Sequence, residues 1–169
     1  MKNIVLTGFM GTGKTAVGRE LSRLLNMKLI DVDTEIEKSQ GITINEIFKS
    51  FGELRFREIE TGMIKKVTEN KNIIISTGGG AVLKEENMDA LRKNGVIVCL
   101  MATPETILKR TSDDSNRPLL QVEDPFRKIK ELLDFRMPFY KKSDIILDTE
   151  GKTPLQIAEE IIERIKDDS

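Results

Sequence analysis

Short apolar runs alternate with amphipathic segments along the whole chain. Five runs are short enough to be strands, and most are continuously apolar, which is typical of strands buried on both faces. They lie at residues 3–7, 29–32, 73–76, 96–101 and 144–147. Stripes of apolar residues at helical spacing separate them, and one stripe consists of Val17, Leu21, Leu24 and Leu25. The alternation predicts an α/β fold in which helices cover both faces of a parallel sheet.

Three threonines mark the starts of expected helices. Thr43 with Glu46 has the spacing of a capping box. Thr153 with Gln156 repeats that spacing, and Thr103 precedes a proline at the first helical position. No repeat or linker interrupts the pattern, so we expect a single domain over residues 1–169. Ligands of such sheets bind beyond the carboxyl ends of the strands, where candidate residues should be sought.

The composition narrows the classes of function. The chain has 169 residues, 38% of them hydrophobic and 33% charged, as is ordinary for a globular protein. A formal net charge of -1 provides no basic field for nucleic acid. No apolar run approaches the roughly 20 residues of a membrane helix, and the N-terminus lacks a secretory signal pattern. We expect a cytoplasmic monomer that acts on a small molecule, without nucleic-acid or membrane partners.

Two residue counts limit the chemistry. The chain has no histidine, which removes the usual general base, Ser-His triads and His-liganded zinc sites. Any proton transfer must therefore use a carboxylate, a lysine or no side chain at all. The single cysteine, Cys99, excludes an internal disulfide, and its place within an apolar run indicates a buried structural thiol.

A phosphate-binding pattern follows the first expected strand. Residues 8–15 read GFMGTGKT, with two glycines, a lysine and a hydroxyl residue at the spacing of a P-loop. Such a loop curls its N–H groups around an anion, while Lys14 can reach the outer phosphates and Thr15 can bind magnesium. The residues expected to bind ATP here are Gly11, Thr12, Gly13, Lys14, Thr15 and Ala16. The alternative, a glycine-rich turn with an incidental lysine, is disfavoured by the strand before and the amphipathic helix after.

A pair of carboxylates closes the second apolar run. Asp31 and Asp33 lie on one side of the chain if the strand continues that far. Beside a P-loop, two acids suit water-mediated magnesium binding and proton acceptance from a hydroxyl. Alternatively, Asp31 merely ends the strand and Asp33 caps a helix that begins near Glu35.

Three glycines follow the third apolar run. Many P-loop proteins carry an aspartate here to hold magnesium, but this chain has Ser76 and Thr77 before Gly78, Gly79 and Gly80. Consecutive glycines lose much backbone entropy on folding, so we predict that the backbone closely approaches another group. A simple loop is the alternative.

Three arginines have unusual settings. Arg57 flanks the apolar face of a helix expected to begin after Gly52. Arg136 continues an apolar stripe, where a charge is costly to bury without an anion, unless the side chain snorkels to solvent. Arg117 lies in the aperiodic polar segment 112–123, which predicts a lid with a mobile positive side chain rather than an ordinary surface loop.

Together these motifs resemble the shikimate kinase family. They are the P-loop at 8–15, Asp31-x-Asp33, Phe56-Arg57-x-x-Glu60, Gly78-Gly79-Gly80, Arg117-Pro118 and Arg136-x-x-x-Tyr140. Each is modest alone, but jointly they are specific, and they extend over nearly the whole chain in the family's order. The resemblance implies a sheet order of 2-3-1-4-5. It also implies phosphorylation of the shikimate 3-hydroxyl by ATP with Mg²⁺, giving shikimate 3-phosphate on the pathway to chorismate and aromatic amino acids.

The resemblance implies further roles at the acceptor end of the site. Arg57 and Arg136 would hold the shikimate carboxylate, and Asp33 would bind the ring hydroxyls and accept the proton of the attacking one. The backbone at Gly79 and Gly80 would also contact the substrate. The pocket would be shaped by Phe48, Phe56 and Glu60, although sequence alone favours plain core positions for the two phenylalanines.

At the nucleotide end, the resemblance implies that Asp31 reaches magnesium through water. Lys14 and Arg117 would act catalytically on the phosphates. Arg110 and Pro154 would enclose the adenine, whereas sequence alone indicates a solvated helix residue at Arg110.

Two other functions remain as alternatives. A gluconate or nucleoside monophosphate kinase would carry the same P-loop, and gluconate is also a hydroxylated carboxylate. A GTP-dependent switch would need an Asn-Lys-x-Asp guanine reader, which this sequence lacks.

Overall fold

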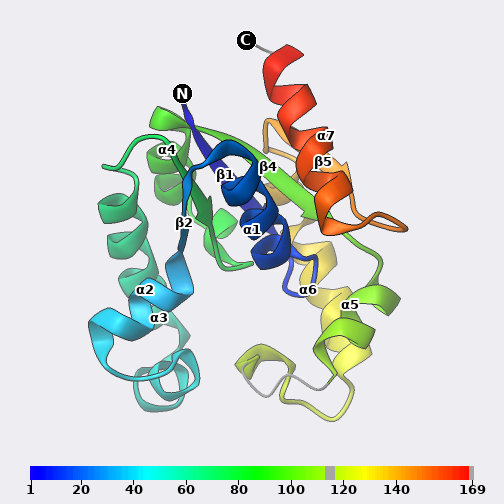
Figure 1. Ribbon diagram of the computed structural model, residues 1–169. Coiled ribbons are helices and arrows are strands. Elements are labelled where there is room, and N and C mark those ends of the chain that lie inside the picture. Colours follow the sequence, from blue (N-terminus) through cyan, green and yellow to red (C-terminus); the bar gives the residue numbers. More distant parts are fainter. Residues whose placement is uncertain (113–116, 168–169) are drawn as a thin grey trace.

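A computed structural model describes residues 1–112 and 117–167 (Figure 1). Five strands form one parallel sheet in the order β2-β3-β1-β4-β5, as expected. The strands are β1 (Asn3–Gly8), β2 (Lys28–Asp31), β3 (Ile73–Ser76), β4 (Gly95–Met101) and β5 (Ile145–Asp148). Residues 113–116 of the predicted lid lie outside the described residues.

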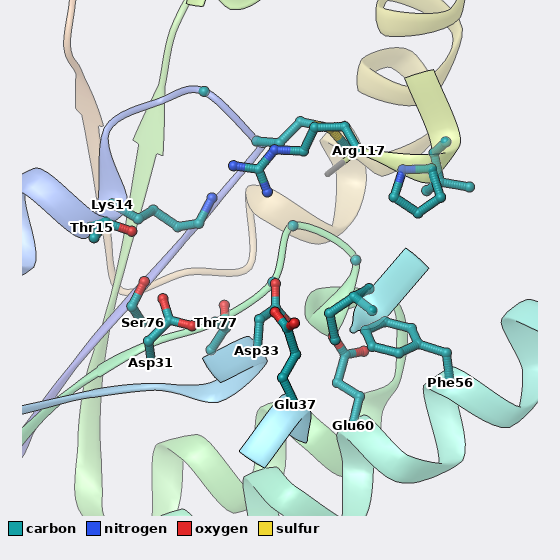
Figure 2. A pocket seen from close by; sticks show the side chains of 18 of the residues that line it. Lys14, Thr15, Asp31, Asp33, Glu37, Phe56, Glu60, Ser76, Thr77 and Arg117 are labelled. Atoms are coloured by element: carbon teal, nitrogen blue, oxygen red, sulfur yellow. The ribbon is translucent and has the colours of Figure 1, made fainter. Parts of the chain in front are cut away.

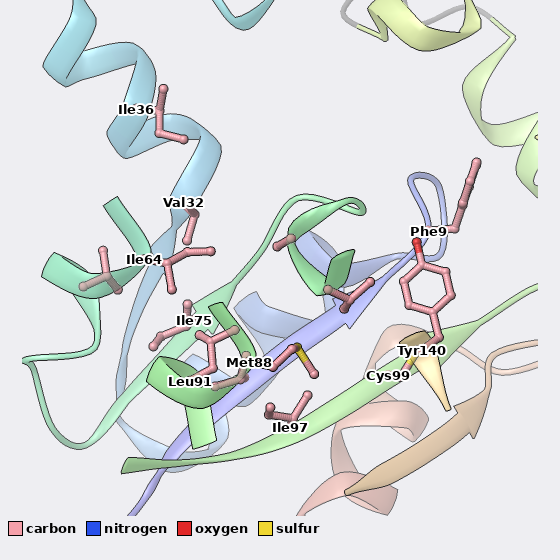
Figure 3. Close-up of a cluster of buried hydrophobic side chains, with 14 of the residues drawn as sticks. Phe9, Val32, Ile36, Ile64, Ile75, Met88, Leu91, Ile97, Cys99 and Tyr140 are labelled. Carbon is pink, nitrogen blue, oxygen red and sulfur yellow. The ribbon is translucent and has the colours of Figure 1, made fainter. Parts of the chain in front are cut away.

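Helices cover both faces of the sheet. They are α1 (Lys14–Leu25), α2 (Val32–Gln40), α3 (Ile44–Val67), α4 (Glu85–Asn94), α5 (Pro104–Thr111), α6 (Pro125–Tyr140) and α7 (Pro154–Asp167), with short 3₁₀ turns η1 (Ala81–Leu83) and η2 (Pro118–Leu120). One hydrophobic cluster joins α1 and α7 to one face. A larger cluster joins α2, α3, α4 and α6 to the other face, where Met88 of α4 lies beside Ile97 of β4 and Tyr140 of α6 lies beside Cys99 (Figure 3). Both clusters confirm the prediction of a sheet buried on two sides.

The second strand is shorter than predicted. It ends at Asp31, one residue before the predicted end at Val32, and α2 begins at Val32, so the condition that the strand continues to Asp33 is not met. The Asp31 side chain accepts a hydrogen bond from the Thr34 N–H at 2.9 Å and thereby caps α2. The alternative was half right. Asp31 does end the strand, but the helix begins at Val32 rather than near Glu35, and Asp33 lies in its first turn instead of capping it. Both carboxylates nevertheless remain at the carboxyl edge of the sheet.

The predicted helix caps are present. Thr43 and Glu46 form a reciprocal capping box, and Thr153 and Gln156 exchange the same two hydrogen bonds. Thr103 caps α5 through the Thr106 N–H. These caps fix the helices that begin near the carboxyl edge.

Helix α3 is kinked at Gly52, where φ is 81° and ψ is 172°. This backbone region is accessible almost only to glycine. The helical pattern therefore resumes after Gly52, as the sequence predicts. The kink allows the rings of Phe48 and Phe56, which lie on either side of it, to pack with centroids 4.8 Å apart.

Cys99 is fully buried in β4, and burial raises the pKa of its thiol to about 11. The prediction of an unreactive structural thiol is consistent with this setting. Within the residues that the structure describes, no helix is both long and apolar enough to span a membrane.

Candidate active site

A cavity of about 500 Å³ lies at the carboxyl edge of the sheet. Residues from seven stretches of the chain line it, and most of the predicted site residues are among them. These are Gly11, Gly13, Lys14, Thr15, Ala16, Asp31, Asp33, Phe48, Phe56, Arg57, Glu60, Gly79, Gly80, Arg117 and Arg136. Three predicted residues, Thr12, Arg110 and Pro154, do not line it. Residues more than 100 positions apart are therefore brought into one site.

The P-loop joins β1 to α1. Gly11 and Gly13 have φ values of 78° and 94°, in the left-handed region that lets the loop curl. The Lys14 ammonium donates to the carbonyl oxygens of Gly8 at 2.7 Å and Phe9 at 2.9 Å, so it folds over its own loop. Burial, with a smaller contribution from Arg117, lowers the pKa of Lys14 to about 8. A phosphate in the loop would favour the charged ammonium and give it a stronger acceptor.

The three predicted residues outside the cavity lie around the P-loop and α5. Thr12 is buried, and its hydroxyl donates to the Phe9 carbonyl at 2.8 Å. Arg110 donates to the Gly11 carbonyl at 3.0 Å, so its guanidinium lies against the P-loop. Pro154 is exposed at the start of α7. The preceding loop is tied to α5, because Glu150 accepts hydrogen bonds from the Thr103 N–H and the Thr106 hydroxyl.

Thr15, Asp31 and Ser76 lie together below the Lys14 side chain (Figure 2). Across residues 1–112 and 117–167, no group of three or more Asp, Glu, His or Cys side chains is arranged to hold a metal ion. Magnesium in nucleotide sites commonly uses one or two protein ligands, together with water and phosphate oxygens. The Thr15 hydroxyl and the Asp31 carboxylate, beside the phosphate loop, fit such a site. A bound nucleotide would supply the remaining oxygens.

The other end of the cavity holds two arginines, a largely buried Arg57 and a fully enclosed Arg136. The Arg57 guanidinium donates to Glu60 at 3.0 Å, and Glu60 is fully buried. Arg136 is 2% exposed and lies over the Phe9 ring, 5.4 Å from its centroid. Its Nε and Nη1 atoms have no hydrogen-bond partner within the described part of the chain. A buried guanidinium with free donors is unfavourable unless an anion reaches it.

Two buried carboxylate oxygens share this environment. Asp33 Oδ1 and Glu60 Oε2 also lack hydrogen-bond partners among the described residues. Burial, followed by the negative charges of Glu60 and Asp31, raises the pKa of Asp33 to about 6. A carboxylate with such a pKa accepts a proton readily near neutral pH. Free donors and free acceptors thus converge on one small volume.

The glycine loop between β3 and η1 passes close to these charged groups. A Cβ at Gly78 would lie 3.0 Å from Glu60 Oε2, and one at Gly79 would lie 3.1 Å from Arg136 Nη1. A Cβ at Gly80 would overlap the Arg57 guanidinium. None of these three glycines has a positive φ, so lack of space explains them. The predicted close approach is confirmed, and the partners are side chains of the same protein.

Arg117 follows directly after the segment that is not described. It lines the cavity, and Figure 2 shows its side chain extending toward the Lys14 ammonium. Its positive charge helps to lower the pKa of Lys14 and offsets a small part of the rise in the pKa of Asp33. The predicted positive side chain therefore already faces the phosphate end of the site.

Three residues to which the sequence analysis gave no role contribute to this site, although Tyr140 belongs to one of the quoted motifs. Glu37 lines the cavity four positions after Asp33, a spacing that places both on one face of α2. The hydroxyl of Tyr140 donates to the Gly79 carbonyl at 2.7 Å. Tyr140 stands one turn after Arg136, so the helical stripe that singled out Arg136 could also have indicated it. Phe9 supports Arg136 from within the P-loop, and no sequence signal indicates that contact.

A P-loop that shares one cavity with a buried carboxylate and two largely buried arginines defines a P-loop kinase that transfers phosphate to a small acceptor. The family model described as "Shikimate kinase" matches residues 10–166. The chain therefore belongs to the shikimate kinase family, and it is an ATP-dependent kinase that acts on an alcohol.

Individual relatives agree over nearly their full lengths. The shikimate kinase of Thermodesulfovibrio yellowstonii is 56% identical over 162 residues, which cover 96% of this chain and 94% of that protein. The solved structure of Acinetobacter baumannii shikimate kinase in complex with shikimate superposes with a TM-score of 0.97 at 39% identity, covering 100% of this chain and 95% of the other. The Aquifex aeolicus enzyme gives a TM-score of 0.87 at 37% identity, covering 98% and 97%.

Proposed function

We propose that this enzyme transfers the terminal phosphate of magnesium-bound ATP to the 3-hydroxyl of shikimate. The observation that carries the proposal is the set of unpartnered polar atoms at the acceptor end of the cavity. Free guanidinium donors on Arg136 suit a carboxylate, while free oxygens on Asp33 and Glu60 suit hydroxyl donors. Shikimate carries one carboxylate and three hydroxyls on a ring. The proposal is supported by this match between the free charged and polar groups of the cavity and the groups of shikimate.

The two arginines act on the carboxylate of the acceptor. Arg136 approaches from α6, and Arg57 approaches from α3 on the other side of the glycine loop. Glu60 holds the Arg57 guanidinium through a buried ion pair, so the side chain is pre-positioned before substrate arrives. The backbone of Gly79 and Gly80 completes the contact surface between the two arginines.

Asp33 accepts the proton from the attacking hydroxyl. Its carboxylate is buried beside the glycine loop, with Oδ1 free and its pKa raised to about 6. Phosphoryl transfer depends more on positioning and charge neutralisation than on a strong base, so a carboxylate of this kind suffices. The packed rings of Phe48 and Phe56 exclude water from the wall of the pocket.

At the nucleotide end, Lys14 and Arg117 neutralise charge on the transferring phosphate. Thr15 would bind magnesium directly and Asp31 through water, and the ion would supply further charge neutralisation on the phosphate oxygens. Arg110 and Pro154 enclose the adenine. The anchoring of Arg110 on the P-loop, and of the loop before Pro154 on α5, supports this placement.

The test is an ADP-release assay with shikimate, gluconate and several nucleoside monophosphates as acceptors. Among these acceptors we expect turnover only with shikimate, and only when magnesium is present. A shikimate analogue without the carboxylate should react poorly with the wild-type enzyme. Arg57→Ala and Arg136→Ala should each weaken shikimate binding by roughly 2–5 kcal/mol and reduce discrimination against the analogue. Equal use of shikimate and the analogue by the wild type would refute the carboxylate assignment.

A further inference from the structure

Tyr140 is a fully buried tyrosine that lines no part of the cavity yet touches its wall. It ends α6, and its hydroxyl donates to the Gly79 carbonyl across 61 positions of sequence at 2.7 Å. Burial raises the pKa of Tyr140 to about 12, so the hydroxyl remains a neutral donor at every physiological pH. Arg136 lies one turn earlier on the same helix and acts electrostatically on this hydroxyl. One helix end therefore contacts the acceptor site through two side chains.

Gly79 is tightly enclosed at this point. A Cβ at Gly79 would lie 3.1 Å from Arg136 Nη1, 3.3 Å from the Gly8 carbonyl oxygen and 3.4 Å from the Met10 nitrogen. The glycine loop is thus sandwiched between the P-loop and Arg136. In such a space, turning the Gly79 carbonyl would move the peptide unit against one of these neighbours.

The geometry of the peptide bond extends the effect of this hydrogen bond to Gly80. The described residues contain no cis peptide, and in a planar trans unit the Gly79 C=O and the Gly80 N–H point in opposite directions. Gly80 is buried and lines the cavity, and its N–H has no hydrogen-bond acceptor in the described part of the chain. Holding the carbonyl on Tyr140 therefore fixes the direction of a free donor at the acceptor site.

We propose that Tyr140 is a positioning residue that orients the Gly79–Gly80 peptide unit so that the Gly80 N–H donates to the bound acceptor. The proposal rests on the proposed function, because that function defines the acceptor. Tyr140 touches neither substrate. It acts through the backbone and holds the Gly80 N–H in the direction in which it and the Arg136 guanidinium can contact the acceptor together.

The first test is Tyr140→Phe, which removes the hydroxyl and keeps the ring. A hydrogen bond of this kind contributes about 0.5–1.5 kcal/mol, which corresponds to a roughly 2- to 12-fold rise in the KM for shikimate. The KM for ATP should stay within about twofold of wild type, since the hydroxyl does not contact the P-loop. Steady-state kinetics with each substrate varied in turn separates the two effects.

The matched control is Thr68→Val. Thr68 is 8% exposed at the end of α3, away from the cavity, and its hydroxyl donates to the Lys65 carbonyl at 2.9 Å. It therefore also loses one hydroxyl-to-carbonyl hydrogen bond on substitution. We expect the control to lower the melting temperature without changing either KM. If Tyr140→Phe behaves in the same way, Tyr140 is only a structural residue and the proposal is wrong.

A second measurement does not depend on a folded variant. Tyr140 is the single tyrosine of the chain, so biosynthetic incorporation of 3-fluorotyrosine labels this residue alone. We expect the ¹⁹F resonance to shift on titration with shikimate, with a midpoint that matches its dissociation constant. A resonance that saturating shikimate leaves unchanged would overturn the proposal. By contrast, a labelled enzyme that is active on another acceptor and inactive on shikimate would refute the proposed function instead.

Discussion

Gly80→Ala separates folding from acceptor binding. The backbone at Gly80 has φ -93° and ψ 1°, in the bridge region that alanine can also adopt. The added methyl carbon would lie 2.6 Å from Arg57 Nη1, so the methyl group and the guanidinium cannot occupy their places together. Arg57 is the end of a long side chain, and it can swing away more easily than the backbone can move. The substitution should displace Arg57 while leaving the fold in place.

The size of the effect follows from the partners of Arg57. Arg57 is one of the two charge partners proposed for the shikimate carboxylate, and removing one partner of a buried charge pair typically weakens binding by about 2–5 kcal/mol. Arg136 still reaches the carboxylate, so we expect the lower end, about 2–3 kcal/mol, or a roughly 30- to 150-fold rise in the KM for shikimate. Glu60 loses its ion pair, but burial already raises its pKa, and proton uptake would limit the loss of stability to about 1–3 kcal/mol. The KM for ATP should not change.

The assay is steady-state kinetics with shikimate and with the analogue that lacks the carboxylate, alongside a thermal melt. Gly62→Ala is the control, because a Cβ at this position in α3 would meet nothing within 4 Å. It should stabilise the helix by up to about 1 kcal/mol and leave both KM values unchanged. A Gly80→Ala enzyme with wild-type affinity for shikimate would refute the reasoning, since it would show that Arg57 is dispensable where the structure places it.

The remaining predictions concern the phosphate end and the base. Lys14→Ala should lower turnover roughly 100- to 1000-fold or more without changing the circular dichroism spectrum, and retained activity would contradict the P-loop assignment. Arg117→Ala should lower kcat on the order of 10³-fold, well beyond its effect on the KM for shikimate; normal turnover would show that residues 112–123 form only a loop. Asp33→Asn should lower kcat by about 10² to 10⁴ and yet raise the melting temperature. The reason is that ionised Asp33, with a pKa raised from 3.8 to about 6, opposes folding at pH 7 by roughly 3 kcal/mol, a penalty that is relieved as pH falls from about 6 to about 4. For the same reason, kcat/KM for shikimate should fall with the uptake of one proton below about pH 6, and a flat profile there would exclude Asp33 as the base.

Much of this architecture could be predicted because burial leaves a strong periodic signal. Strands buried on both faces are continuously apolar, and their number, parallel pairing and two covering layers follow from that pattern. Boundaries are set by local hydrogen bonds, which the pattern does not contain. The bond from the Thr34 N–H to Asp31 caps α2, and the second strand ends at Asp31, one residue earlier than expected.

For the candidate site, the sequence likewise indicated individual residues but not the contacts between them. A guanidinium within an apolar stripe and three successive glycines each violate a local preference, and such violations mark functional positions. The sequence did not reveal which groups meet, because contacts such as Arg57 over Gly80, Phe9 under Arg136 and Tyr140 on Gly79 join distant segments. Those contacts depend on the packing of α3 and α6 against the P-loop.

The kink at Gly52 has a consequence for how acceptor preference can change in evolution. In an unbroken helix, Phe48 and Phe56 would be about 12 Å apart along the axis, and their rings could not pack at 4.8 Å. One pair of backbone torsions therefore sets the contour of this pocket wall. A mutation at or beside Gly52 could reshape the wall while every residue that lines the cavity stays the same. Related kinases with identical lining residues could thus diverge in the acceptors they admit, and comparing their binding residues alone would not reveal it.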